Sequence, residues 1–329
     1  MDVASKKTLK LFSGQGHPDL AGEIAAELAV PLGDIKLSTF ASGDSYVRYG
    51  ENIRGADAFL LQTHCDPVND RIMEQLLMID AAKRASAKRI TAVIPFYGYA
   101  RQDRKAEGRE PISARLLADL LTAAGADRVV TVDLHTGQIQ GFFDFPVDHL
   151  TAVPLLAEHM STLVTGEAVT VVAPDAGGGK LAHRFSNQLG EFGIEAELAF
   201  VDKQRPKGTH NVAVANQVVG AVEGRTCVLI DDMIDTGGTL ASAAQLLVDR
   251  GADSVLIAAT HGVLSGHAID RLKNSVISKV VVTNTLPLPP EKQIDKLEVL
   301  SVARVIADAI DAVFEDTSVS EIFDGANQT

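Results

Sequence analysis

The chain has 329 residues, of which 43 are acidic and 30 basic, so its formal net charge is −13. This length suits two domains of about 150 residues each. The negative charge disfavours nucleic acids and anionic membranes as partners, so local groups would have to hold any anionic substrate. Cys65 and Cys227 lie in apolar surroundings far apart in the sequence, as reduced thiols do, and no apolar run reaches the roughly 20 residues of a membrane helix. We therefore expect a soluble, cytoplasmic protein.

Short β-branched stretches alternate with helical patterns along the chain. Strands are expected at 89–96, 127–135, 168–175, 225–232, 253–261 and 279–284. Apolar spacing near 3.6 residues predicts helices over 70–85, 112–124, 238–250 and 302–314. This alternation is typical of parallel sheets covered by helices.

An internal repeat indicates that the fold is duplicated. Residues 120–137 aligned with 246–263 keep two leucines, a Gly-Ala-Asp sequence, a valine and a histidine in register. We therefore predict two copies of one α/β unit, with a seam near residues 146–154. The expected division is an N-terminal domain over 1–150, a C-terminal domain over 151–302, and a helix and tail over 303–329 packed on the N-terminal domain.

The first copy contains a long connection, residues 96–111, where the second copy has only a short turn. Loops beyond about 12 to 15 residues inside a compact domain are usually functional or disordered. This one carries Arg101, Arg104, Lys105 and Arg109 in an acidic chain, with aromatic residues at its base. We interpret it as a lid over a polyphosphate, with a nucleotide ring stacked near the base. A solvated loop with internal ion pairs is the alternative.

The stretch VLIDDMIDTGGT, residues 228–239, runs from a buried strand into a Gly-rich turn before a helix. Such a turn surrounds a small anion with backbone N–H groups. Neither this turn nor DAGGGKLAH matches the triphosphate loop GxxxxGK[ST], so a monophosphate fits better. Ionised carboxylates only accept hydrogen bonds, so Asp231 and Asp232 suit the hydroxyls of a sugar whose 5-phosphate lies in the turn.

The segment TVDLH supplies a possible metal site. Asp133 and His135 are two residues apart on an expected strand, so both should point to one face at its C-terminal end. Oxygen and imidazole ligands can hold Mg²⁺ beside substrate phosphates. In the second copy His261 matches His135, but Ala259 matches Asp133, so we expect this pair in the first copy and a structural role for His261.

Several of these segments together resemble the ribose-phosphate pyrophosphokinase family. VLIDDMIDTGGT resembles the phosphoribosyl-binding loop of the type I phosphoribosyltransferase fold, and the stretches around residues 69–105, 125–150 and 259–266 are similar to that family in the same order. The resemblance covers nearly the whole chain. It implies an α/β fold of two similar type I phosphoribosyltransferase-like domains, each a mainly parallel sheet flanked by helices.

The resemblance also implies an activity. Members transfer the β,γ-diphosphoryl group of MgATP to the 1-hydroxyl of ribose 5-phosphate, giving 5-phosphoribosyl 1-diphosphate and AMP for nucleotide, histidine and tryptophan biosynthesis. Homohexamers, the Mg²⁺ cofactor, and inorganic phosphate and ADP as effectors are implied as well. A phosphoribosyltransferase and a non-catalytic partner subunit of the same fold remain the alternatives.

Site residues follow by matching positions. The resemblance implies catalytic roles for Lys203 and Arg205. For ATP it implies Ser42, Gly43, Asp44, Arg101, Gln102, Arg104 and His135. For ribose 5-phosphate it implies Asp231, Asp232, Asp235, Thr236, Gly237, Gly238 and Thr239. For Mg²⁺ it implies His135 and Asp175, in addition to Asp133, which the TVDLH pattern proposes.

Two positions depart from the common family pattern. Ser42 and Asp44 stand where many members carry Asp and Glu, in a segment that reaches the adenine from a neighbouring subunit. Gln204 stands where Arg is frequent. A non-catalytic subunit would be expected to lose some of the residues Arg101, Asp133, His135, Lys203 and Arg205, and this chain has them all.

Overall fold

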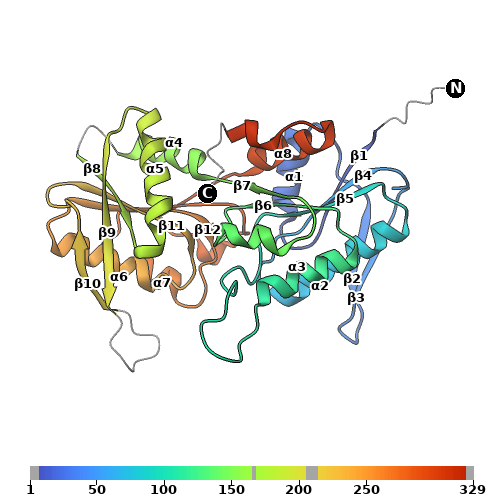
Figure 1. The fold of residues 1–329 in the computed structure, drawn as a ribbon, viewed down its shortest axis with the longest axis horizontal. Coiled ribbons are helices and arrows are strands. Elements are labelled where there is room, and N and C mark those ends of the chain that lie inside the picture. The colour runs from blue at the N-terminus through green and yellow to red at the C-terminus, as the bar shows by residue number, and fades with distance from the viewer. Residues whose placement is uncertain (1–6, 165–167, 205–213, 324–329) are drawn as a thin grey trace. The chain divides into compact units, whose positions relative to one another are not determined.

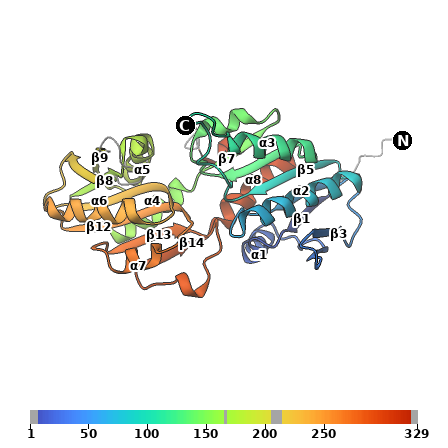
Figure 2. The same ribbon diagram turned by 90° about the horizontal axis from the view of Figure 1, so that it is seen from below.

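The computed structural model describes residues 7–164, 168–204 and 214–323, without the side chains of 176, 203, 204 and 214–216. The chain forms two compact units, whose elements are labelled in Figure 1 and seen from a second direction in Figure 2. Of the described residues, the first unit contains 7–151, Thr285–Pro287 and 301–323. The second contains Ala152–Asn284 and Leu288–Leu300.

The first unit is built on a parallel five-stranded sheet with the order β1-β4-β5-β6-β7. Its strands are β1 (Leu9–Ser13), β4 (Asp57–Leu61), β5 (Arg89–Ile94), β6 (Arg128–Val132) and β7 (Val147–Leu150). An antiparallel hairpin stands apart from this sheet and consists of β2 (Ile35–Thr39) and β3 (Ser45–Tyr49). The helical elements are α1 (Pro18–Glu27), α2 (Val68–Arg84), α3 (Ser113–Ala124), η1 (Gly137–Phe142), α8 (Ala303–Glu315) and η4 (Val319–Phe323).

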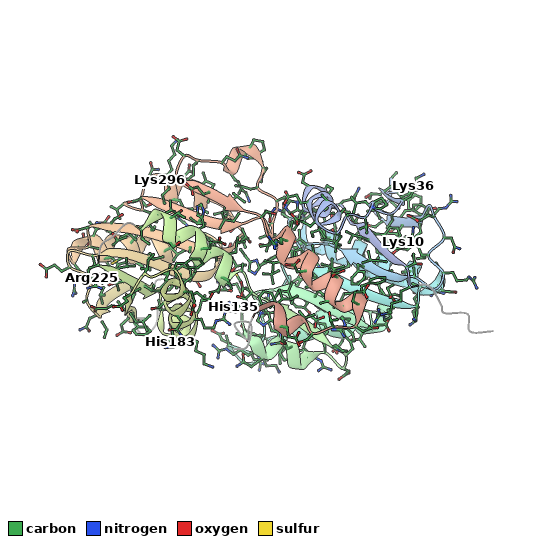
Figure 3. All side chains as sticks on the ribbon, turned by 90° about the horizontal axis from the view of Figure 1, so that it is seen from above. Lys10, Lys36, His135, His183, Arg225 and Lys296 are labelled. Carbon is green, nitrogen blue, oxygen red and sulfur yellow. The ribbon has the colours of Figure 1, made fainter. Side chains whose placement is uncertain are left out.

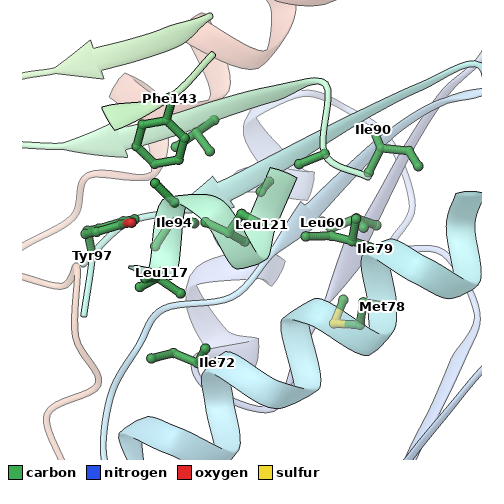
Figure 4. Packing of buried hydrophobic residues seen from close by; sticks show 14 of the residues in the cluster. Leu60, Ile72, Met78, Ile79, Ile90, Ile94, Tyr97, Leu117, Leu121 and Phe143 are labelled. Carbon is green, nitrogen blue, oxygen red and sulfur yellow. The ribbon is translucent and has the colours of Figure 1, made fainter. Parts of the chain in front are cut away.

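Helices cover both faces of this sheet. Figure 1 shows α2 and α3 side by side on one face, and α1 with α8 on the other. Figure 4 shows how Leu60 of β4, Ile79 of α2 and Leu121 of α3 meet in the core under the first pair. The strands read as continuous apolar runs because both of their faces are buried, as a doubly covered parallel sheet requires.

The second unit is built on a seven-stranded sheet with the order β10-β9-β8-β11-β12-β13-β14, in which the β9–β10 pair is antiparallel and the other pairs are parallel. Its strands are β8 (Val169–Ala173), β9 (Ala196–Gln204), β10 (Val214–Val219), β11 (Thr226–Ile234), β12 (Ser254–Gly262), β13 (Lys279–Thr283) and β14 (Leu297–Leu300). The helical elements are α4 (Val153–Leu163), η2 (Ala176–Gly178), α5 (Gly179–Glu191), α6 (Gly238–Asp249), α7 (Ala268–Lys273) and η3 (Pro290–Lys292). Figure 1 shows α4 and α5 on one face of the sheet, and α6 and α7 on the other.

The two units repeat one arrangement, and the predicted fold class is confirmed. The neighbouring strands β4-β5-β6-β7 correspond to β8-β11-β12-β13. After the helix that precedes β6 or β12, a glycine takes a left-handed conformation, Gly125 with φ 112° and Gly251 with φ 88°. The aspartate two residues later, Asp127 or Asp253, donates its backbone N–H to a carbonyl at the start of the neighbouring strand, over 2.8 or 3.0 Å. The helices expected over 70–85, 112–124, 238–250 and 302–314 are α2, α3, α6 and α8, within two residues at each end.

The end of α8 is fixed to the sheet of the first unit by ion pairs. The buried Asp57 accepts hydrogen bonds from Nε and Nη2 of Arg89 over 2.8 and 2.7 Å, and Nη1 of Arg89 reaches Asp316 over 2.5 Å. Asp316 also pairs with Lys7, and hydrogen bonds from Lys7 and then Arg89 lower the pKa of Asp316 to about 2. Among the helices of the described residues, none combines the length and hydrophobicity needed to cross a membrane.

Candidate functional site

The turn predicted to bind a phosphate lies in the second unit, between the end of β11 at Ile234 and the start of α6 at Gly238. Gly237 precedes the helix with φ 70°, a left-handed conformation that a glycine adopts without steric cost. A Cβ at this position would also lie 3.6 Å from the carbonyl oxygen of Ala268. The turn therefore brings the chain directly onto the N-terminus of a 12-residue helix, where backbone N–H groups favour an anion.

Asp231 and Asp232 lie in the last part of β11, and both are half-buried. Oδ1 of Asp231 accepts the backbone N–H of Asp232 over 2.9 Å. Burial, and then the charge of the neighbouring Asp232, raises the pKa of Asp231 well above its ordinary value. Two carboxylates so close together are stabilised by hydrogen-bond donors that carry no negative charge. Sugar hydroxyls are donors of this kind.

Asp175 follows β8 at the start of the other Gly-rich segment of the second unit. Its Oδ1 accepts the backbone N–H groups of Gly177 and Gly178 over 2.9 and 3.2 Å, so the carboxylate caps its own turn. Because both hydrogen bonds end at Oδ1, the fixed and exposed carboxylate can still offer Oδ2 to a cation.

The placement of Asp133 and His135 on a strand is wrong. Strand β6 ends at Val132, and Asp133 has a φ of 35°, so the alternation of a strand does not apply to these residues. Tertiary hydrogen bonds explain the turn, because Asp133 donates its N–H to the carbonyl of Leu150 over 2.9 Å and Leu134 donates its N–H to Nε2 of His149 over 2.8 Å. Asp133 is buried here, whereas His135, which is labelled in Figure 3, is exposed.

The start of the 96–111 loop is hydrogen-bonded to a buried histidine, His64, which the sequence analysis did not single out. Nδ1 of His64 accepts the N–H of Gly98 over 2.9 Å, so Nε2 carries the proton and donates to Oε1 of Gln75, also over 2.9 Å. Burial lowers the pKa of His64 to about 4. The sequence signal that could have identified His64 is its position three residues after the end of β4 at Leu61, at the carboxyl end of a parallel sheet, where open α/β folds place functional groups.

The rest of this loop is tied to two neighbouring segments of the first unit. Oε1 of Gln102 accepts the hydroxyl hydrogen of Ser113, the first residue of α3, over 2.6 Å. Asp103 accepts a hydrogen bond from the hydroxyl of Thr136 over 2.8 Å, and Thr136 adjoins His135. The structure thus brings Arg101, Gln102 and Arg104 to the segment that carries His135, and all four of these residues are exposed.

Ser42, Gly43 and Asp44 form the exposed tip of the β2–β3 hairpin. The Ser42 hydroxyl donates to Asp44 over 2.8 Å, and Gly43 has a φ of 96°. The hairpin and the 96–111 loop contact different parts of α2, because the hydroxyl of Tyr49 donates to the carbonyl of Met78, whereas the hydroxyl of Tyr99 donates to Asn69. The structure therefore keeps the hairpin tip apart from the other residues predicted to bind ATP within the first unit (Figure 1).

The two predicted catalytic cations lie at the edge of what the structure describes. The backbone of Lys203 belongs to β9 and pairs with that of Ala215 in β10. The side chain of Lys203 and the whole of Arg205 lie outside the described residues. Their catalytic role remains a prediction.

A preformed cluster for a metal ion is not found among the described residues, where no three or more His, Cys, Asp or Glu side chains are arranged to hold one. Asp133 and His135 belong to the first unit, and Asp175 to the second. Mg²⁺ is usually bound through one or two carboxylates together with substrate phosphates and water, so the donor chemistry of these residues fits that ion.

Comparison with known proteins gives the family. A family model described as the N-terminal domain of ribose phosphate pyrophosphokinase matches residues 9–125, and one described as the phosphoribosyl synthetase-associated domain matches residues 194–324. Proteins named ribose-phosphate pyrophosphokinase are similar over their whole length. The relative from Streptomyces avermitilis is 56% identical over 322 residues, 98% of each chain, and that from Mycobacterium leprae is 55% identical over 321 residues, 98% of this chain and 97% of the relative.

A solved structure agrees with the sequence relatives. The crystal structure of phosphoribosylpyrophosphate synthetase from Mycobacterium smegmatis superposes with a TM-score of 0.89 at 52% sequence identity, and the match covers 94% of this chain and 100% of that one. Both family models, relatives at more than half identity and this structure therefore lead to one conclusion. The chain belongs to the ribose-phosphate pyrophosphokinase family of enzymes.

Proposed function

We propose that this enzyme transfers the diphosphoryl group of MgATP to the 1-hydroxyl of ribose 5-phosphate, giving 5-phospho-α-D-ribose 1-diphosphate and AMP. The observation that carries the proposal is the β11–α6 connection, in which two crowded carboxylates precede a left-handed glycine turn at a helix N-terminus. Family membership favours the same reaction.

The second unit binds the sugar phosphate. Backbone N–H groups of residues 235–239 and the hydroxyls of Thr236 and Thr239 hold the 5-phosphate, since the helix N-terminus favours an anion. Asp231 and Asp232 accept hydrogen bonds from the 2- and 3-hydroxyls. The phosphate and the sugar thus occupy two chemically different parts of one connection.

The first unit binds ATP through the loop that carries Arg101, Gln102 and Arg104 and through His135. The Asp103–Thr136 hydrogen bond supports this assignment because it joins the loop to the segment that holds His135. Arginine suits phosphate oxygens because its planar donors pair with them. The assignment of Ser42, Gly43 and Asp44 to the adenine rests on the family resemblance.

In the reaction, the 1-oxygen of ribose 5-phosphate forms a bond to the β-phosphorus of ATP, the bond from that phosphorus to the α,β-bridging oxygen breaks, and AMP leaves. The proton of the 1-hydroxyl is released. Asp133, His135 and Asp175 would hold Mg²⁺, which when bound neutralises phosphate charge. Lys203 and Arg205 stabilise charge on the transferred group.

The wider physiological assignments are proposed on the resemblance alone. They are supply of precursors for nucleotide, histidine and tryptophan biosynthesis, a cytoplasmic location, assembly into a homohexamer, and control by inorganic phosphate and ADP. Sedimentation of the purified protein would test the hexamer directly.

The reaction is tested by incubating the purified protein with ATP, MgCl₂ and ribose 5-phosphate and following the products by phosphorus NMR. We expect AMP and a sugar diphosphate in equal amounts. Formation of ADP with a singly phosphorylated new position would show an ordinary kinase. In a second incubation with 5-phosphoribosyl 1-diphosphate and a free base but no ATP, consumption of both would show a phosphoribosyltransferase. A protein that is inert in both incubations would show a non-catalytic subunit.

A further inference from the structure

The proposed phosphate turn does not stand alone, because the segment that follows β12 lies along it. This segment runs from Leu264 to the end of α7 at Lys273. It contacts three consecutive residues before the glycines of the turn. The N–H of Leu264 donates to the carbonyl of Ile234 over 2.9 Å, and the N–H of Ser265 donates to the carbonyl of Asp235 over 3.0 Å.

Side chains of the same segment complete the contact. The hydroxyl of Ser265 donates to Oδ1 of Asp235, and Nη1 of Arg271 donates to the carbonyl of Thr236 over 2.8 Å. The backbone of Gly237 lies against the start of α7, since a Cβ there would meet Ala268 at 3.6 Å. Residues 234–237 are thus held from one side by a separate piece of chain.

Backbone strain accompanies these contacts. Leu264 is fully buried and has a φ of 50°, a left-handed conformation that is strained for a residue other than glycine. Strained residues persist where the surrounding structure fixes them, and they cluster near functional sites. Here the strained residue is the one that begins the contact with the turn.

The guanidinium of Arg271 also brings charge to the turn. Its Nη1 would lie 3.7 Å from a Cβ placed on Gly238, the first residue of α6. A cation therefore stands beside the helix end that would receive the 5-phosphate. The same group engages the Thr236 carbonyl, whose partial negative charge would otherwise oppose an anion in the turn.

We propose that Arg271 and Ser265 are positioning residues of the sugar-phosphate subsite. Arg271 fixes the Thr236 peptide and lowers the electrostatic cost of a phosphate at the N-terminus of α6. Ser265 holds the Asp235 carboxylate by a hydrogen bond, so that this negative group keeps a fixed place within an anion-binding turn. The inference rests on the proposed function, because it deepens the assignment of the turn to ribose 5-phosphate.

A residue that only stabilises the fold would give a different set of kinetic and stability changes when it is replaced. Loss of a residue that only stabilises the fold lowers thermal stability and the amount of active enzyme, and it affects KM for both substrates alike. Loss of a positioning group weakens the affinity for one substrate and leaves the other substrate and the fold unchanged. Replacement of Arg271 by Lys keeps the charge but loses the planar set of donors, so this variant separates charge from geometry.

The test compares Arg271→Gln, Arg271→Lys and Ser265→Ala with the wild type. Arg250→Gln is the matched control, because it removes an exposed arginine at the other end of α6. Steady-state kinetics give KM for each substrate, calorimetric titration with ribose 5-phosphate in the absence of ATP gives Kd, and thermal unfolding gives Tm. We expect Arg271→Gln to raise KM and Kd for ribose 5-phosphate by about tenfold, equivalent to about 1.4 kcal/mol. Arg271→Lys and Ser265→Ala should have smaller effects in the same direction.

The proposal also requires that KM for ATP, Tm and the Arg250→Gln control stay close to the wild type. It is overturned if Arg271→Gln binds ribose 5-phosphate like the wild type, or if KM rises equally for both substrates with a fall in Tm. A wild-type protein that binds ribose 5-phosphate but forms no AMP would contradict the proposed reaction while leaving the Arg271 comparison valid. A wild-type protein that does not bind ribose 5-phosphate would overturn both.

Discussion

The backbone N–H of Gly98 donates a hydrogen bond to Nδ1 of the fully buried His64 over 2.9 Å. The opposite ring nitrogen bonds to Gln75, so the ring is held between α2 and the start of the 96–111 loop. A Cβ on Gly98 would lie 3.0 Å from the Cβ of His64, so the two segments of the chain approach as closely as a glycine allows. The root of the loop is therefore rigidly placed.

This arrangement predicts a pH-dependent loss of stability. Burial lowers the pKa of His64 from 6.5 to about 4, so the unfolded chain takes up a proton first as the pH falls. The stability that the neutral ring provides is complete above pH 6.5 and is lost as the pH falls toward 4, by about 3 kcal/mol in total. His64→Asn keeps an acceptor but does not titrate. The free energy of unfolding of the wild type should therefore fall relative to that of His64→Asn between pH 7.5 and pH 4.5, measured by urea denaturation.

The exposed His267 lies outside this arrangement, and the His267→Gln variant should still lose stability relative to His64→Asn over the same pH range. Parallel pH profiles for the wild type and His64→Asn would show that His64 titrates normally.

For Asp231 we predict the opposite pH dependence of the free energy of unfolding. Its pKa is raised by burial and by Asp232, so the folded protein holds this proton more tightly than the unfolded chain. The contribution of Asp231 to stability is greatest below the ordinary carboxyl pKa and falls as the pH rises. Asp231→Asn should gain stability relative to the wild type from pH 4 to pH 7.5 in urea denaturation, while KM for ribose 5-phosphate rises more than KM for ATP.

Asp253→Asn, at an exposed position of the second unit, should change neither quantity. If Asp231→Asn proves less stable than the wild type at pH 7.5, crowding between the two carboxylates is not the dominant effect. If it raises both KM values equally, Asp231 has no selective role toward the sugar.

The 96–111 loop predicts a local response to nucleotide. Most of its residues from Arg101 to Pro111 are exposed, although its root is fixed by His64 and its middle by Thr136. Hydrogen exchange over residues 100–110 should slow when a nonhydrolysable ATP analogue is added, whereas exchange at Gly98 should already be slow. Ribose 5-phosphate alone should leave both unchanged. Unaltered exchange at saturating analogue would exclude this loop as a lid.

Lys203 and Arg205 are predicted to act on the transition state. A well-placed cation contributes about 10³ to 10⁵ to the rate of phosphoryl transfer, whereas a surface charge contributes little. Lys203→Ala should therefore lower kcat by about 10³ or more with KM values changed only a few fold, and Arg205→Ala should do the same to a smaller degree. Lys88→Ala, at an exposed site of the first unit, is the control. A Lys203→Ala defect that disappears at saturating substrate would indicate ground-state binding instead.

Local sequence patterns predicted the repeated framework well. Strands β5, β6, β8, β11, β12 and β13 and helices α2, α3, α6 and α8 all lie where periodicity indicated, because a doubly covered sheet imposes continuous apolar runs and its helices impose a 3.6-residue stripe. The Gly-Ala-Asp repeat reflects a shared helix end, in which Gly125 and Gly251 take the left-handed conformation.

Features set by distant contacts escaped the same reasoning. The left-handed Asp133 depends on hydrogen bonds made by the β7 region, which no pattern around residue 133 contains. The contacts of Arg271 with the turn at Thr236 join residues 35 apart, and those of His64 with Gly98 join residues 34 apart. Chemical type and spacing pointed to the turn that we propose for the phosphate, but not to the groups that contact this turn.

The position of α8 has a consequence for how the chain is made. This helix packs against α1, and its end contacts Lys7, which precedes β1, and Arg89 of β5. The first unit is therefore completed by residues that follow the second. During synthesis on the ribosome, the second unit can therefore bury its core while α1 still lacks its partner. The apolar face of α1 stays uncovered until residues 303–315 emerge, and exposed apolar surface of this kind favours aggregation during that period.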